Sequence, residues 1–191
     1  MKTAIVTDTN SGITVEEGRQ SGIFVLPMPV IIEEHCYLEG VDITNEDLYQ
    51  AMTADKNLSS SQPSPGDVMD LWNRVLESGY DEIVHIPMSS GLSGSCQTAK
   101  QLALDYDSKV QVVDNHRISV TLMESVYDAK FLADQGKSAV EIRKYLEETA
   151  YQASIFLTVN SLKYLKKSGR ITSSAAAIAN ILNIKPLLTI Q

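Results

Sequence analysis

Short apolar runs alternate with amphipathic stretches along most of the chain. Four runs have the length and composition of buried strands: residues 4–6, 83–88, 110–113 and 155–159. The clearest helix follows Pro65 and ends near Gly79. Its apolar residues share one buried face at helical spacing: Val68, Leu71, Trp72, Val75 and Leu76. Strands that alternate with helices predict an α/β fold with a parallel sheet and helices on both faces.

Capping residues predict the ends of the remaining helices. The signals are a capping box of Thr14 and Glu17, a cap at Thr44, a closing Gly136 after residues 119–135, and a capping box of Ser138 and Glu141. Residues 23–32 are apolar but contain Pro27 and Pro29, which cannot donate ladder hydrogen bonds. We therefore expect an edge strand or an extended crossing there, and a polar loop over residues 55–64.

The residue composition of the sequence changes near residue 160. A basic element over residues 162–171 is followed by a run of small residues at 172–179 and an apolar stretch at 181–190. We expect an N-terminal α/β domain at residues 1–160 and the beginning of a second, smaller α/β domain at residues 161–191. The last stretch resembles a strand without its partners, so the second domain is expected to be incomplete here.

Composition narrows the classes of function. The formal net charge of -8 and a pI near 4.8 argue against a nucleic-acid binder. Cys36 and Cys96 are far apart and have no partner at metal spacing, which argues against disulfide and zinc scaffolds. We expect residues 1–6 to enter a short strand rather than to form a signal peptide, and no apolar run reaches the roughly 18 residues of a membrane span. We expect a cytoplasmic protein with no stable membrane insertion.

Candidate chemistry centres on Ser89-Ser90-Gly91-Leu92-Ser93-Gly94, which joins a buried strand to a helix expected to begin near Ser93. Glycines allow a sharp turn, and the first amides of a helix favour a carboxylate or phosphate. Loops that follow parallel strands meet at one edge of the sheet, so we expect residues 8–12, 89–94 and 114–117 to converge. Residues 59–67, before the helix at Pro65, add further hydroxyls.

Other kinds of site fit less well. Gly91-Leu92-Ser93 begins like the nucleophile elbow of a serine hydrolase, but Ser95 replaces its second glycine. His116 and Asp114 also stand in reversed order for that fold, although triads occur in other orders. A hydrolase using Ser93 therefore remains the alternative. Asp8 stands at the end of a strand, as the nucleophile of an aspartyl-phosphate phosphotransferase does, but an Asp/Asn turn is the better interpretation. We expect His85 to be a structural histidine whose hydrogen bonds are satisfied. The sequence contains no Walker motif and no set of metal ligands.

Five segments together resemble the DegV family of bacterial fatty-acid-binding proteins. In chain order they are Ile5-Val6-Thr7-Asp8-Thr9, Ser60-Ser61-Gln62-Pro63-Ser64, Ser89 to Gly94, Ser168-Gly169-Arg170-Ile171 and Leu182-Asn183-Ile184-Lys185-Pro186. The resemblance implies a non-enzymatic carrier without a cofactor or metal, which holds one long-chain fatty acid between an N-terminal and a smaller C-terminal α/β domain. It also implies a partner fatty acid kinase that makes acyl phosphate for phospholipid synthesis.

The resemblance implies roles for individual residues. It places the fatty-acid carboxylate on Ser60 and Ser93, with Ser61 and amides near Gly94 as further contacts, and assigns Arg170 to the head group or the kinase. Family chains continue further and carry a histidine near the carboxylate, which His116 could replace. The tail could be lined by Ile31, Ile86, Leu92 and residues 175–178.

Overall fold

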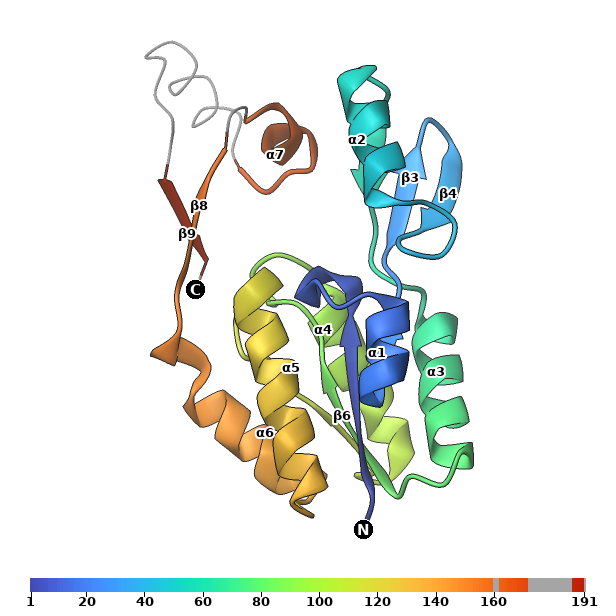
Figure 1. The fold of residues 1–191 in the computed structure, drawn as a ribbon, viewed down its shortest axis with the longest axis vertical. Helices are drawn as coiled ribbons and strands as arrows, with labels where there is room; N and C mark the ends of the chain where they lie inside the picture. Colours follow the sequence, from blue (N-terminus) through green and yellow to red (C-terminus); the bar gives the residue numbers. More distant parts are fainter. Residues whose placement is uncertain (160–161, 172–186, 191) are drawn as a thin grey trace.

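A four-stranded parallel sheet forms the centre of the molecule. The computed structural model describes residues 1–159, 162–171 and 187–190. The strands, in the spatial order β2-β1-β6-β7, are β2 (Ile23–Leu26), β1 (Thr3–Asp8), β6 (Glu82–Ile86) and β7 (Val110–Val112). Every residue of β1 is buried, as expected for a central strand covered on both faces. The predicted parallel sheet is confirmed (Figure 1).

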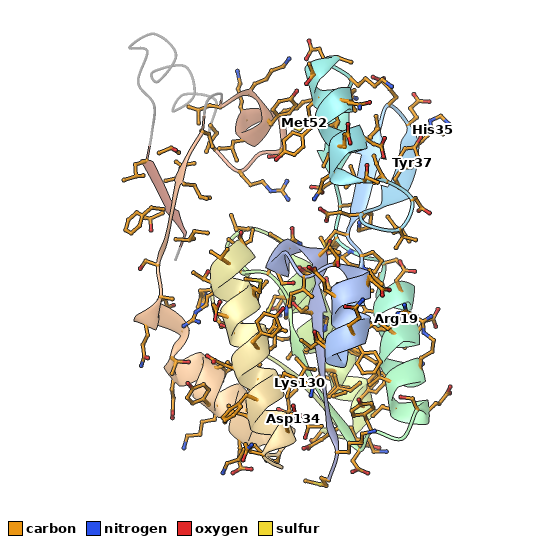
Figure 2. All side chains as sticks on the ribbon, in the orientation of Figure 1. Arg19, His35, Tyr37, Met52, Lys130 and Asp134 are labelled. Atoms are coloured by element: carbon orange, nitrogen blue, oxygen red, sulfur yellow. The ribbon has the colours of Figure 1, made fainter. Side chains whose placement is uncertain are left out.

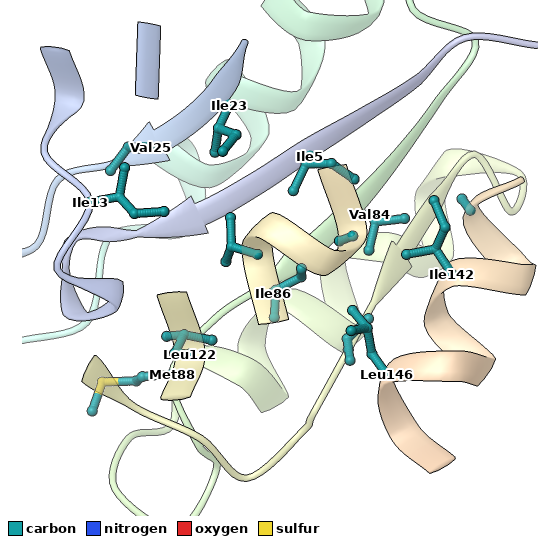
Figure 3. Packing of buried hydrophobic residues seen from close by; sticks show 14 of the residues in the cluster. Ile5, Ile13, Ile23, Val25, Val84, Ile86, Met88, Leu122, Ile142 and Leu146 are labelled. Atoms are coloured by element: carbon teal, nitrogen blue, oxygen red, sulfur yellow. The ribbon is translucent and has the colours of Figure 1, made fainter. Parts of the chain in front are cut away.

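Helices cover both faces of this sheet. One face packs against α5 (Ser119–Asp134) and α6 (Ala139–Glu148), and the other against α3 (Pro65–Glu77) and α4 (Ser95–Leu102). Because side chains alternate along a strand, Ile5 and Val84 point into the first cluster while Val6 and Ile83 point into the second. Figure 3 shows the first cluster, in which Ile5, Val84 and Ile86 meet Leu122, Ile142 and Leu146.

The helix ends predicted from capping residues agree with the structure. Capping boxes begin α1 (Val15–Ser21) at Thr14 and α6 at Ser138, and Thr44 caps α2 (Asn45–Thr53). Gly79 and Gly136 follow the ends of α3 and α5 with φ of 95° and 80°, where a side chain would be strained. Local hydrogen bonding by Ser and Thr side chains is enough to fix these boundaries.

Residues 23–32 differ from the prediction, because they form two strands in two different sheets. β2 is the expected edge strand, but β3 (Pro29–Ile32) is the central strand of an antiparallel sheet in the order β4-β3-β5. Its partners are β4 (His35–Leu38) and β5 (Leu58–Ser60), and β5 lies inside the segment predicted to be a loop. Pro29 is tolerated since it is the first residue of its strand. α2 packs on this sheet through Ala51.

The chain leaves the parallel sheet after α6. The one-turn helices η2 (Ala103–Tyr106) and η3 (Ala150–Gln152) precede β7 and β8 (Ile155–Thr158), respectively. β8 pairs antiparallel with β9 (Leu187–Ile190), so the last strand has a partner, contrary to expectation. α7 (Lys163–Lys167) lies between them in sequence. The expected boundary at residue 160 stays a prediction, and the small-residue run at 172–179 lies outside the described residues.

Candidate functional site

Three loops meet at the carboxyl edge of the parallel sheet, and Asp8 joins two of them. Asp8 is the last residue of β1 and is 1% exposed. Its Oδ2 accepts the N–H of Met88 at 3.0 Å, and its Oδ1 accepts the backbone and side-chain N–H groups of Asn10 at 3.0 and 2.9 Å. Burial raises the pKa of Asp8, and these hydrogen bonds oppose the shift.

Residues 114–117, named here the 114–117 loop, join the same edge. The N–H of Ser89 donates to the carbonyl of Arg117 at 2.9 Å, and the N–H of Ser90 donates to Oδ1 of Asp114 at 3.3 Å. Burial alone would raise the pKa of Asp114, but the hydrogen bonds from Ser90 hold that pKa below its ordinary value. The predicted convergence of the three loops is therefore confirmed.

Residues 89–94, named here the 89–94 loop, bond mainly to themselves. The carbonyl of the fully buried Ser89 accepts the N–H groups of Leu92 at 3.0 Å and Ser93 at 3.2 Å. The hydroxyl of Ser89 accepts the N–H of Gly91 at 3.2 Å. The N–H groups of Gly91, Leu92 and Ser93 are therefore used inside the loop and are not available to a ligand.

The donors that remain gather at the start of α4. This helix begins at Ser95 rather than near Ser93, because Oγ of Ser93 accepts the N–H of Ser95 at 3.2 Å and Gly94 takes the capping position. Within the described part of the chain, the N–H groups of Gly94, Cys96 and Gln97 and the O–H of Ser93 have no acceptor. First-turn amides and a hydroxyl at a helix N-terminus suit one carboxylate or phosphate.

Residues 59–64, named here the 59–64 loop, carry the other predicted serines. Ser60 ends β5 opposite Val30, and Ser60 and Ser61 are both exposed. The hydroxyl of Ser61 donates to the carbonyl of Gln62 at 3.2 Å, whereas the hydroxyl of Ser60 bonds to none of the described residues. Ser60 is therefore accessible to a ligand at the rim of the small antiparallel sheet.

Gln62 brings the two serine loops together. Its Oε1 accepts the hydroxyl proton of Thr98, in the first turns of α4, at 3.3 Å. The same oxygen lies 3.1 Å from the place that a Cβ on Gly94 would occupy, so a side chain there would push against it. The sequence did not single out Gln62, although its place between two predicted ligand serines could have pointed to it. Gly94 thus permits the close approach of the 59–64 loop to α4.

Arg170 belongs to a different element. The N–H of Gly169 donates to Lys166 and that of Arg170 to Leu165, so Ser168-Gly169-Arg170 closes α7 as a Schellman motif. The guanidinium of Arg170 is exposed and donates to the carbonyl of Ser168 at 2.6 Å. No hydrogen bond or ion pair in the described structure joins Arg170 to Ser60, Ser61, Ser93 or Gly94.

α7 is held beside α2. The hydroxyl of Tyr164 donates to the carbonyl of Met52 at 3.0 Å, and Lys163 pairs with Asp55. Figure 2 shows Met52 on the side of α2 that faces α7. Figure 1 shows both helices beyond the carboxyl ends of the parallel strands, the side on which the three loops converge.

Of the proposed tail-lining residues, 175–178 lie outside the described residues and Ile86 is packed inside the core.

His85 is buried on β6, as expected for a structural residue, but it is not hydrogen-bonded. Neither ring nitrogen has a partner among the described residues, and burial lowers the pKa of His85 to about 3, which keeps the ring neutral. The rings of Trp72 and His85 meet edge to face, with 5.5 Å between their centroids. A void of about 10 Å³, lined by Asp8, His85 and Ser95 among others, lies beneath the start of α4.

The geometry does not support nucleophilic catalysis by Ser93. A serine nucleophile needs a neighbouring base, and the structure gives Ser93 no hydrogen bond to any described histidine. His116 stacks on Tyr151 at 5.2 Å instead, with Nδ1 3.7 Å from Asp114.

Cys96 is buried, and that burial raises its pKa to about 12, so its thiol stays protonated.

The described residues form neither a metal site nor a membrane span. In residues 1–159, 162–171 and 187–190, no group of three His, Cys, Asp or Glu side chains could hold a metal ion. Over the same ranges, no helix is both long and apolar enough to cross a bilayer.

Solved structures share this fold. A DegV family protein from Thermus thermophilus, whose structure is described as showing fatty acid binding, has a TM-score of 0.87 and 29% identity, covering 100% of this chain and 68% of that one. DegV from Bacillus subtilis, described as a fatty acid binding protein, has a TM-score of 0.85 and 27% identity with the same coverage. A stearic acid-binding protein from Eubacterium ventriosum gives 0.85 and 28%, covering 99% and 67%.

Sequence relationships lead to the same group of proteins. DegV domain-containing proteins from Deinococcus radiodurans and Clostridium acetobutylicum are 34% and 36% identical over 192 residues, covering 100% of this chain and 68% of each relative. The family model described as "Uncharacterised protein, DegV family" matches residues 2–191. This chain therefore belongs to the DegV family.

Proposed function

We propose that this chain binds a long-chain fatty acid and presents its carboxylate to a partner kinase for acyl-phosphate formation. The carboxylate would lie between the 59–64 loop and the start of α4, in contact with Ser60, Ser61, Ser93 and Gly94. The solved relatives described as fatty acid binding support the class of ligand. We place this activity in the cytoplasm, where the thiols of two free cysteines would stay reduced.

One observation carries the proposal. A hydroxyl at Ser93 and the amides of Gly94, Cys96 and Gln97 are unused donors at a helix N-terminus, among the residues described. The exposed hydroxyl of Ser60 stands on the loop that Gln62 fastens to the same helix. An ionised carboxylate offers about four acceptor positions, which matches such a set of donors.

Physical magnitudes assign different tasks to the tail and the head. Burying a dozen methylenes at about 0.8 kcal/mol each contributes roughly 10 kcal/mol of gross transfer free energy. Each hydrogen bond to the charged head adds only about 1.5–3 kcal/mol. The tail should therefore dominate affinity, and the donor cluster should fix where the carboxylate lies. We propose that residues 161–191 begin a second unit that covers the tail.

Solvent extraction and affinity measurements test the binding proposal. The protein purified from bacteria should release fatty acid into organic solvent. Ser93→Ala should weaken fatty-acid affinity by about tenfold to a hundredfold, because it removes a hydrogen bond to a charged group. Ser90→Ala is the matched control, since Ser90 lies in the same loop and its hydrogen bonds go to Asp114 rather than to the donor cluster at α4.

Two results would contradict the binding assignment. If Ser93→Ala bound fatty acid with unchanged affinity, the carboxylate would not lie at the start of α4. Turnover of a chromogenic ester that Ser93→Ala abolishes would favour a serine hydrolase instead. Ser60→Ala tests the second loop against Ser59→Ala, its exposed neighbour on β5.

The role proposed for Arg170 needs a separate measurement. Arg170→Ala should leave fatty-acid affinity unchanged and reduce acyl-phosphate formation with the kinase, because the exposed guanidinium contacts none of the proposed carboxylate ligands among the described residues. Lys167→Ala removes a neighbouring exposed charge as the control. A large loss of lipid affinity in Arg170→Ala would show that this residue holds the head group itself.

A further inference from the structure

Arg117 is a buried cation whose role is not explained by the donor cluster at α4. The residue is 8% exposed, and its guanidinium donates to the carbonyls of Thr149 at 2.5 Å and Ala150 at 3.1 Å and to the hydroxyl of Ser125 at 2.7 Å. Burial lowers the pKa of Arg117, but a guanidinium stays charged at neutral pH. A charge in this position is compensated by carbonyls at the carboxyl end of α6.

Those carbonyls belong to the segment through which the chain leaves the parallel-sheet unit. α6 ends at Glu148, η3 follows at Ala150–Gln152, and β8 then pairs only with β9 among the described strands. Figure 1 shows the chain passing from α6 through this segment and running away from the helices of the sheet into β8. We name residues 149–152 the exit segment. Whatever holds it also sets the direction in which β8 leaves.

The 114–117 loop contacts the exit segment at two successive residues. Arg117 binds Thr149 and Ala150, and the ring of His116 stacks on Tyr151 with an interplanar angle of 15°. His116 has φ of 56°, a left-handed conformation that is uncommon for a residue other than glycine. Strained backbone of this kind persists where surrounding contacts hold it in place.

The same loop also holds the 89–94 loop. The carbonyl of Arg117 accepts the N–H of Ser89, and the carboxylate of Asp114 accepts the N–H of Ser90. Arg117 thus uses its main chain on the 89–94 loop and its side chain on the exit segment. A shift of the exit segment would displace the guanidinium of Arg117. It would thereby also strain the hydrogen bond between the carbonyl of Arg117 and the N–H of Ser89.

We propose that Arg117 is a positioning residue that couples the 89–94 loop to the exit segment, so that head-group binding and the placement of β8 and β9 influence each other. The inference rests on the proposed function only for the identity of the ligand. Coupling between two sites is reciprocal, and values of about fivefold to 150-fold are typical.

Hydrogen exchange of backbone amides in the whole chain tests the coupling, with palmitate as the probe. In the native protein, palmitate should slow exchange in the exit segment by about fivefold or more, although its carboxylate is expected at Ser93. Arg117→Met should abolish this slowing, because methionine has no donor for the three acceptors. Arg117→Lys keeps the charge and a donor, and should restore part of it.

The controls separate coupling from general loss of stability. Arg143→Met removes an arginine of α6 that pairs with Glu147 and contacts neither loop, and it should leave the response to palmitate intact. If Arg117→Met does not fold, Tyr151→Ala replaces it, because Tyr151 is 69% exposed and its loss removes only the stack on His116. A smaller loss of response in the same direction is then expected.

Failure of the coupling and failure of the proposed function give different results. If palmitate binds and Arg117→Met still transmits the slowing, or Arg143→Met removes it equally, the coupling is overturned while lipid binding stands. If palmitate does not bind, hydrogen exchange of the native protein and of Arg117→Met without ligand tests the coupling. Arg117→Met should then speed exchange in both the 89–94 loop and the exit segment, and faster exchange in the exit segment alone would overturn the coupling.

Discussion

The two loops proposed to hold one carboxylate are built in different ways. The 89–94 loop follows a strand of the central sheet. Asp8 holds Met88 directly before the loop, and Asp114 and Arg117 accept from the loop itself, in addition to its own hydrogen bonds. The 59–64 loop runs from a three-residue strand of the small antiparallel sheet to the capping box at Ser64, and it contacts α4 where Oε1 of Gln62 accepts the hydroxyl proton of Thr98. We infer that the first loop is preorganised, whereas the position of the second depends on how well the small sheet is held.

The largest effect should come from the anchor of the first loop. Asp8→Ala leaves the buried N–H of Met88 and the donors of Asn10 without their acceptor. We expect the free energy of unfolding to fall by about 3 kcal/mol, since each unsatisfied buried group costs about 1–3 kcal/mol. Urea denaturation measures it. An unchanged midpoint would show that the 89–94 loop does not depend on Asp8.

The same carboxyl gives a prediction of pH dependence. Because burial raises the pKa of Asp8 above its ordinary value of 3.8, the folded state binds the proton more tightly than the unfolded state. The extra stability that comes from binding this proton is therefore complete below about pH 3.8 and is lost as the pH rises through the folded pKa. Asp8→Asn has no titrating carboxyl at this position and cannot show this loss. The difference in the free energy of unfolding between the native protein and Asp8→Asn, measured with urea at each pH, cancels the effects of the other carboxylates. A difference that grows with pH would contradict the raised pKa.

Weakening the small sheet should disturb only the second loop. Ile32 is 9% exposed in the small cluster under α2, and Ile32→Ala should lower the free energy of unfolding by about 2 kcal/mol. Hydrogen exchange should become faster in β5 and stay unchanged in the 89–94 loop. Equal acceleration in both loops would mean that they are held as one unit. Leu122→Ala, in the core under the parallel sheet, is the control that should loosen the first loop as well.

The smallest effect concerns the contact between the loops. Thr98→Val keeps the shape of the side chain and removes the hydroxyl that donates to Gln62. An exposed hydrogen bond of this kind contributes about 0.5–1 kcal/mol, so stability should change little. Fatty-acid affinity should fall by a few-fold if the contact places Ser60, as measured by ligand titration. An effect as large as that of Ser93→Ala would show that Thr98 itself touches the ligand.

The sequence predicted those parts of the fold that depend on local signals. Thr14, Thr44 and Ser138 announce helix starts, because a side-chain oxygen satisfies amides of the first helical turn wherever the helix later packs. β5 and the central place of β3 could not be predicted, because Leu58-Ser59-Ser60 carries no strand pattern of its own. Its strand conformation comes from hydrogen bonds to a partner distant in the sequence.

The candidate site divides in the same way. The positions of three predicted strands and the rule that loops of parallel strands meet at one edge were enough to expect residues 8–12, 89–94 and 114–117 together, and the resemblance assigned the carboxylate to Ser60 and Ser93. Which amides stay available was decided only by tertiary structure. Ser89 accepts the N–H groups of Gly91, Leu92 and Ser93, Oε1 of Gln62 lies close to Gly94, and Arg117 joins the 89–94 loop to the exit segment. Hydrogen bonds between distant residues depend on where the elements pack, and local sequence does not record that.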